Sequence, residues 1–207
     1  MQEANLCTAL VLGATGLVGR ALVAKLKDDQ RYRQITCLVR SSAGLKGNNC
    51  QEVITDFSRM QEYDSYFQAS HIYVCLGTTI KQAGSKAAFR AVDFELVYQA
   101  AQLAARQQAM SFVWISSVGA DARSRSFYLR TKGELEEAIF AMQGLKRPAQ
   151  VRPSLLLGER REFRFSERLG TMFAPLYSPL LRGRLAKYRP IAAEKVAEQM
   201  IGLQYFG

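Results

Sequence analysis

Short apolar segments alternate along the chain with longer segments in which apolar residues recur every three or four positions. Continuous apolar runs are typical of strands buried on both faces, whereas the longer spacing is typical of amphipathic helices. We predict strands over residues 6–13, 35–40, 51–56, 71–77, 111–117 and 149–158, and helices over residues 17–29, 86–108, 128–142 and 191–203.

The alternation of strands and helices predicts an α/β fold, in which helices cover both faces of a parallel sheet. A chain of 207 residues, 48% of them apolar, can bury one substantial core, so we expect a single domain over residues 1–207. Residues 158–190 break the pattern, because they mix arginines and prolines with bulky apolar side chains. We expect them to form a small irregular cap on the substrate side of the sheet.

The N-terminal segment and the cysteines exclude several classes of protein. The first apolar run has no basic residue before it and breaks at Gly13 after about eight residues, too early for a signal peptide or a membrane span. We therefore expect a cytoplasmic protein that binds no membrane. The chain has one histidine, His71, and its cysteines are widely spaced, so we expect neither a disulfide nor a metal site. The cysteines are Cys7, Cys37, Cys50 and Cys75.

The formal net charge of +10 is concentrated in one part of the chain. Residues 123–189 contain fifteen Lys and Arg against six Asp and Glu, a net charge of +9. Such a segment is either a solvated basic face or a site for an anion, such as a phosphate-bearing cofactor or an acidic substrate. It contains no lysine-rich tract, recognition helix or interleaved aromatic platform, and we predict no nucleic-acid binding.

The stretch VLGATGLVGRALV places glycines at 13, 16 and 19, between the first predicted strand and the first predicted helix. Glycine at such a turn permits a positive φ and lets backbone N–H groups approach a pyrophosphate, which the positive end of the helix also favours. At the start of an α/β pattern this turn indicates a dinucleotide site and a Rossmann fold with strand order 3-2-1-4-5-6. The candidate contacts in the turn are Gly13, Thr15, Gly16, Leu17, Val18 and Gly19.

The second predicted strand ends on Arg40, where an NAD enzyme would carry an acidic residue for the ribose hydroxyls. A guanidinium can instead form a bidentate pair with a 2′-phosphate, so we predict a preference for NADP(H) over NAD(H). Ser41 and Ser42 could add hydroxyl donors to that phosphate, and Asp56 is expected near the adenine. The alternative is that Arg40 only begins a solvated loop.

Two further segments are candidate cofactor contacts. CLGTT, after the fourth strand, contributes Leu76, Gly77 and Thr78, and its glycine either lets the chain pass close to the middle of the cofactor or simply starts a loop. Leu155, in RPSLLLG, either packs against the nicotinamide ring or is a buried strand end.

Tyr128 and Lys132 lie four residues apart at the start of a predicted helix, so both side chains leave one face. This spacing often arises by chance. Here it follows the fifth strand, which ends on Ser116 and Ser117 at the carboxyl edge of the sheet, where ligands bind in open α/β folds. We predict Tyr128, Lys132 and Ser117 as catalytic residues, although the spacing does not rank Ser116 against Ser117.

Several motifs together resemble the atypical short-chain dehydrogenase/reductases of the Tat-interacting protein (TIP30, CC3) group, namely GATGLVGR, CLGTT, AGSKAAFRAVD, SSVGAD, YLRTKGE and RPSLLLG. The G-x-x-G-x-x-G spacing also points to that superfamily. The resemblance implies a Rossmann fold, NADPH binding and an oxidoreductase that acts on a small carbonyl or alcohol substrate. It makes Tyr128 the proton donor or acceptor, Lys132 its partner and Ser117 the residue that holds the carbonyl.

Two departures qualify this interpretation. Asp93 stands where the superfamily usually has asparagine, and the spacing from serine to tyrosine is shorter than usual. The basic cap, Asp93 and the resemblance to a group whose human member is linked to regulation support an alternative, a non-catalytic NADPH-sensing regulator that binds a protein partner. Gly133 costs the helix interior about 1 kcal/mol relative to alanine, which either close packing of the cofactor or a strand, or a harmless surface position, would explain.

Overall fold

A computed structural model of the protein describes residues 6–154, 156–157 and 190–206. The predicted cap, apart from Pro190, lies outside the described residues, and so does Leu155.

Six parallel strands form one sheet in the order β3-β2-β1-β4-β5-β6, which confirms the predicted Rossmann topology. The central strand β1 pairs with β2 and β4, so that Leu12 lies beside Leu38 and Val74. The strands are β1 Cys7–Leu12, β2 Tyr32–Val39, β3 Cys50–Ile54, β4 His71–Val74, β5 Ser111–Ile115 and β6 Pro148–Val151.

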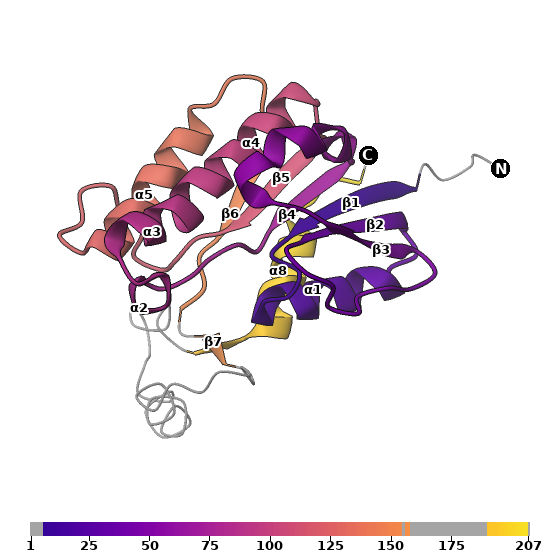
Figure 1. The fold of residues 1–207 in the computed structure, drawn as a ribbon, viewed down its shortest axis with the longest axis horizontal. Helices are drawn as coiled ribbons and strands as arrows, with labels where there is room; N and C mark the ends of the chain where they lie inside the picture. The colour runs from indigo at the N-terminus through magenta and orange to yellow at the C-terminus, as the bar shows by residue number, and fades with distance from the viewer. Residues whose placement is uncertain (1–5, 155, 158–189, 207) are drawn as a thin grey trace.

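Helices cover both faces of the sheet (Figure 1). Alternate strand residues point to opposite faces, so Ala9 and Val11 pack in the cluster with α1 and α8, while Leu10 and Leu12 pack in the cluster with η1, α4 and α5. The helical elements are α1 Leu17–Asp28, the 3₁₀ segment η1 Phe57–Gln68, α2 Ile80–Ala83, α3 Lys86–Arg90, the π-helical segment η2 Ala91–Leu96, α4 Val97–Arg106, α5 Phe127–Phe140 and α8 Ala193–Gly202.

The structure differs from the predicted elements in several places. The helix predicted over 86–108 contains the π-helical turn η2 in its middle. The segment η1 was not predicted, because its sequence is mostly polar and its three buried side chains are Phe57, Met60 and Phe67. The strand predicted over 149–158 is broken near Pro153, and its last part, β7 Leu156–Leu157, pairs with β8 Ile191–Ala192 in a separate small sheet.

The only histidine of the chain joins the sheet to the C-terminal segment. Tyr73 and Tyr32 contact each other through their hydroxyls at 2.7 Å, and the Tyr32 hydroxyl lies 2.6 Å from His71 Nδ1. His71 Nε2 lies 2.5 Å from the carbonyl oxygen of Tyr205, so Nε2 carries the proton and Nδ1 accepts one from Tyr32. The side chain of His71 is completely buried, and burial lowers its pKa.

This burial predicts a loss of stability in mild acid. The unfolded chain takes up a proton near pH 6.5 and the folded chain resists it, so the free energy of unfolding falls below about pH 6.5 by up to about 1.4 kcal/mol per pH unit. We expect urea unfolding between about pH 7.5 and pH 5.5 to show this loss in the wild type and a smaller one in His71→Gln, because glutamine does not titrate. Equal losses in the two proteins would exclude His71 as the cause. Asp29 and Arg31, the nearby charges, are the same in both.

Candidate functional site

The turn between β1 and α1 is packed against the segment that follows β4. Gly13 has a φ of +79°, and a Cβ at this position would lie 2.6 Å from the carbonyl group of Cys75. A Cβ at Gly19 would lie 2.1 Å from the carbonyl oxygen of Gly13. The protein's own packing therefore requires glycine at both positions.

Gly16 and Gly77, in contrast, are not required by packing. The nearest atom to a Cβ at Gly16 is the Gly13 carbonyl oxygen at 3.4 Å, and at Gly77 it is Asp93 Oδ1 at 3.5 Å. Gly16 is the N-cap of α1, and no side chain caps the helix or places an acid in its first turn. The bare N-terminus of a helix is suited to a pyrophosphate, so the turn with Leu17 and Val18 fits the dinucleotide predicted for it.

A polar pocket of about 430 Å³ lies beside this turn, lined by Thr15, Arg20, Arg40, Ser41, Ser42 and Ala43. Arg40 and Ser41 were predicted to contact the cofactor here, whereas Arg20 was missed. Arg20 is exposed, and its Nε donates to the carbonyl oxygen of Thr15 at 3.0 Å. The signal was available in the sequence, because Arg20 directly follows the last glycine of the turn and the helix start meets the carboxyl ends of the strands.

The loop that forms one wall of the pocket is held by Glu52. The Ser42 hydroxyl and the backbone N–H groups of Ala43 and Leu45 each donate to the Glu52 carboxylate at 2.9 Å. The Leu45 N–H is the main cause of the lowered pKa of Glu52. Ser42 lines the pocket, but its hydroxyl donates to Glu52, so its contact with a 2′-phosphate stays a prediction.

Asp56 lies two residues after the end of β3 and has an exposed side chain. Its Oδ1 accepts a hydrogen bond from the Ser58 N–H at 2.9 Å and caps η1. The structure thus gives Asp56 a capping role, and its place near the adenine stays a prediction.

Lys132 and Asp93 form a buried ion pair beneath the carboxyl edge of the sheet. Lys132 Nζ lies 2.7 Å from Asp93 Oδ1 and donates to the carbonyl oxygen of Ile115 at 3.4 Å. Asp93 Oδ2 accepts a hydrogen bond from the Thr78 N–H at 2.7 Å. The segment after β4, the end of β5 and the helix α5 therefore meet at this pair.

Tyr128 stands one turn before Lys132 on α5. It is half-buried, with its ring centroid 5.6 Å from that of Phe89 on α3. Within the described part of the chain its hydroxyl has no hydrogen-bond partner, so a ligand can use it.

Ser117 is half-buried and donates only a long bond of 3.3 Å to the Val118 carbonyl oxygen, whereas Ser116 is 2% exposed and its hydroxyl has no partner among the described residues. This difference in access favours Ser117 as the substrate-side serine.

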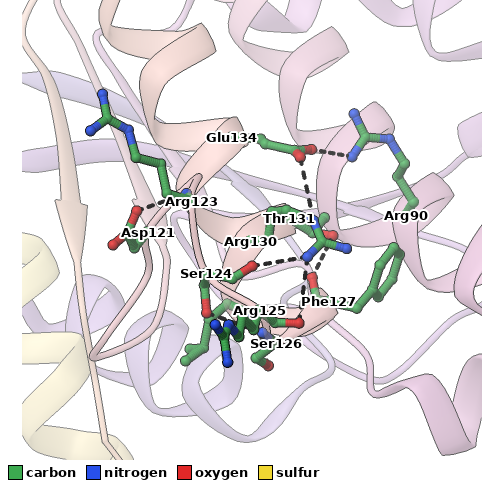
Figure 2. Close-up of polar contacts among 11 residues, drawn as sticks. Arg90, Asp121, Arg123, Ser124, Arg125, Ser126, Phe127, Arg130, Thr131 and Glu134 are labelled. Atoms are coloured by element: carbon green, nitrogen blue, oxygen red, sulfur yellow. Dashed lines mark hydrogen bonds and ion pairs between the residues drawn. The ribbon is translucent and has the colours of Figure 1, made fainter.

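The start of α5 is fixed by a polar network (Figure 2). The Ser126 hydroxyl accepts from the Leu129 N–H at 3.5 Å and caps the helix. Arg130 donates to the carbonyl oxygen of Ser124 at 2.9 Å, and Glu134 pairs with Arg90 of α3 at 2.5 Å. These contacts hold the first turn of α5, and hence Tyr128, against α3.

Gly133 is explained by neither a cofactor nor a strand. It is buried, and a Cβ there would lie 2.2 Å from the backbone of Asp121 and Ala122. The loop between β5 and α5 crosses the helix at this point, which requires glycine. Gly133 therefore sets the course of the loop that leads from Ser117 to Tyr128.

Residues 9–188 match the model of the NAD dependent epimerase/dehydratase family. The chain belongs to this family. It is 30% identical over 201 residues to the mitochondrial protein FMP52 of Candida albicans, in an alignment that covers 94% of this chain and 86% of the relative. It is 32% identical over 170 residues to the protein HTATIP2 of Rattus norvegicus, in an alignment that covers 80% of this chain and 69% of the relative. The second relative confirms the resemblance to the Tat-interacting protein group.

Solved structures agree with the Rossmann fold. UDP-glucose 4-epimerase of Thermotoga maritima, solved with UDP-glucose, superposes with a TM-score of 0.70 at 14% identity over 94% of this chain and 72% of that one. The enzyme WbmG of Bordetella bronchiseptica, solved with NAD, gives 0.64 at 12% identity over 83% of this chain. The alignment covers 62% of the WbmG chain, so this chain corresponds to only part of that enzyme.

The expectation of a cytoplasmic protein is contradicted by the relatives. The FMP52 proteins of Candida albicans, Scheffersomyces stipitis and Meyerozyma guilliermondii are named as mitochondrial. The expectation rested on the lack of a long apolar leader, which mitochondrial targeting does not need. Among the described helices, none has the length and apolar character to cross a membrane.

Proposed function

We propose that the protein is an NADP(H)-binding oxidoreductase that transfers hydride between NADPH and a small carbonyl or alcohol compound. The observation that carries the proposal is the pair of arginines, Arg20 and Arg40, which line one polar pocket beside the glycine turn. Two guanidinium groups suit a 2′-phosphate, and no acidic residue lines the pocket among the described residues.

The candidate site residues named below have separate parts in this proposal. The turn from Gly13 to Gly19 would hold the diphosphate, and Arg20 and Arg40 the 2′-phosphate. Bound NADPH supplies the hydride. Ser117 would hold the carbonyl oxygen by a hydrogen bond, and the free hydroxyl of Tyr128 would donate a proton to that oxygen.

A titration tests the choice of cofactor. We expect the wild type, followed by protein fluorescence, to bind NADPH about 10- to 100-fold more tightly than NADH, because a hydrogen bond to a charged group contributes about 1.5 to 3 kcal/mol. Arg40→Asp and Arg20→Asp should each reduce this ratio, since a carboxylate repels the 2′-phosphate.

Arg33→Asp is the matched control, because Arg33 is exposed at the other end of β2 and the change in net charge is the same. This variant should keep the preference for NADPH. Equal affinities for both cofactors in the wild type, or equal effects of Arg33→Asp and Arg40→Asp, would refute the 2′-phosphate site.

The alternative, a non-catalytic regulator, depended on the cap, on Asp93 and on the resemblance to a group whose human member is linked to regulation. The cap lies outside the described residues, and Asp93 contacts Lys132 directly. The Tyr128 hydroxyl, which is half-buried and has no partner among the described residues, favours the oxidoreductase, and we retain the oxidoreductase as the proposed function.

A further inference from the structure

Two segments that meet at the start of α5 carry a strong excess of positive charge. Residues 75–92, after β4, and residues 118–130, after β5, together contain six Lys and Arg and one Asp, a net charge of +5. Both segments follow strands at the carboxyl edge of the sheet, where ligands bind in open α/β folds. The charge is therefore concentrated around the candidate site. The cations are Lys81, Lys86, Arg90, Arg123, Arg125 and Arg130.

A cluster of aromatic rings places part of this charge beside Tyr128. The centroid of the Phe89 ring, on α3, lies 6.0 Å from that of Phe127 and 5.6 Å from that of Tyr128. Lys86 Nζ lies 5.4 Å from the centroid of the Phe127 ring. The Phe89 ring thus contacts both the ring under Lys86 and the ring of Tyr128. Arg125 stands two residues before Phe127, in the loop after β5 that leads to α5.

Two of the six cations are used within the protein. Arg90 forms ion pairs with Glu134 and Glu95, at 2.5 and 3.5 Å. Arg130 lies 3.9 Å from Glu134 and donates to the carbonyl oxygen of Ser124 at 2.9 Å. These two arginines hold the start of α5 in place, so their charges are partly neutralised.

Lys86 and Arg125, in contrast, are exposed and have no carboxylate partner among the described residues. Asp121, the one acid of the two segments, accepts a hydrogen bond from the backbone N–H of Arg123 at 2.8 Å, and Figure 2 shows the Arg123 side chain pointing away from the start of α5. Lys81, on α2, is exposed too, but it makes no ring contact in the described part of the chain. Lys86 and Arg125 are therefore the cations left for a ligand at this end of the site.

The concentration of charge favours a ligand over a merely solvated face. The two segments hold +5 of the chain's net charge of +10. Like charges gathered at one edge repel one another and destabilise the folded state. A bound anion offsets this repulsion, and a site lined by one sign of charge attracts ligands of the opposite sign.

We propose that Lys86 and Arg125 are specificity-determining residues, which select substrates whose carbonyl group is joined to an acidic group, a carboxylate or a phosphate. This inference rests on the proposed function and names its substrate class. The Tyr128 and Ser117 hydroxyls take the carbonyl oxygen, while the two cations hold the anionic end by charge-assisted hydrogen bonds.

Pairs of carbonyl compounds that differ in charge test the proposal. We expect the wild type, saturated with NADPH, to reduce 4-carboxybenzaldehyde with a kcat/KM about 10-fold or more above that for its uncharged methyl ester. A second pair, 4-formylphenyl phosphate and 4-methoxybenzaldehyde, tests a phosphate in the same way, and the pair with the larger ratio identifies the acidic group. The ratio should fall as sodium chloride is raised from about 20 to about 300 mM, because salt screens exposed charges.

Lys86→Ala and Arg125→Ala should each lower the ratio of charged to uncharged kcat/KM by about 3- to 10-fold, mainly through KM, and the double variant should lower it further. Arg123→Ala is the matched control, because it removes an exposed arginine from the same loop while its side chain points away from the start of α5. This control should keep the wild-type ratio.

A wild-type ratio near one for both pairs, or a double variant that keeps the wild-type ratio, would overturn the proposal. An equal fall in Arg123→Ala would also overturn it, because net charge alone would then explain the effect. A weaker affinity of the double variant for NADPH would assign the two cations to the cofactor instead, with the same consequence.

A wild type that reduces none of the four compounds would refute the proposed function, and calorimetry then decides the inference separately. The probe is 4-(hydroxymethyl)benzoate, added to the protein with NADPH. Binding that the double variant weakens by about 10-fold or more, and that Arg123→Ala leaves unchanged, would support the anion site. Absent binding, or binding that the double variant leaves unchanged, would overturn it.

Discussion

Tyr128→Phe is expected to lower kcat/KM for NADPH-dependent reduction of aldehydes and ketones by about 10²- to 10⁴-fold, the usual contribution of a positioned proton donor. The substitution removes only the hydroxyl, which has no partner among the described residues, and keeps the ring against Phe89. The free energy of unfolding should therefore change by less than about 0.5 kcal/mol, and the dissociation constant for NADPH should stay the same.

The measurement is the oxidation of NADPH against a panel of small carbonyl compounds, with NADPH binding followed by fluorescence. Tyr66→Phe, on η1, is the matched control, because it removes a tyrosine hydroxyl from a segment that carries no predicted site residue. A wild type that binds NADPH but oxidises none of it would exclude the reductase. A Tyr128→Phe variant as active as the wild type would exclude Tyr128 as the proton donor.

Gly13→Ala is expected to cost about 2 to 5 kcal/mol of the free energy of unfolding and to abolish NADPH binding. The positive φ accounts for about 1 to 2 kcal/mol, and forcing a methyl group against the Cys75 carbonyl for another 1 to 3 kcal/mol or so. The second cost arises from backbone atoms, which cannot move aside as a flexible side chain can.

Gly144→Ala separates the two costs. Gly144 has the same φ of +79°, but a Cβ there would have no atom within 4 Å. Urea unfolding should therefore show a loss of only about 1 to 2 kcal/mol for this variant, and NADPH binding should be kept. If the two variants lose equal stability, the close packing of the turn against Cys75 does not contribute.

Local sequence patterns were sufficient for most of the fold. The apolar runs and the helical spacing are properties of neighbouring residues, and they indicated all six strands of the main sheet and the helices α1, α5 and α8. The pattern could not show the π-helical turn at Asp93, because the turn depends on contacts outside the helix. Nor did it show η1, whose buried side chains are few.

The candidate site was predicted in part. The glycines of the first turn and Arg40 could be assigned from the sequence, because each has a fixed place relative to a strand end. Arg20 was missed, although it directly follows the last glycine of the turn, because packing decides which face of α1 meets the β2 loop. The orientation of Ser42 toward Glu52 likewise depends on how β2 pairs with β3.

By itself, the sequence determined the order of strands and helices, the glycine turn between β1 and α1 and the one-turn separation of Tyr128 and Lys132, because these features follow from the geometry of neighbouring residues. Only the tertiary structure decided that Lys132 pairs with Asp93, that Gly133 packs under the loop at Asp121, and that His71 contacts the C-terminal segment. These contacts join segments far apart in the chain, and they form only when the sheet brings the elements together.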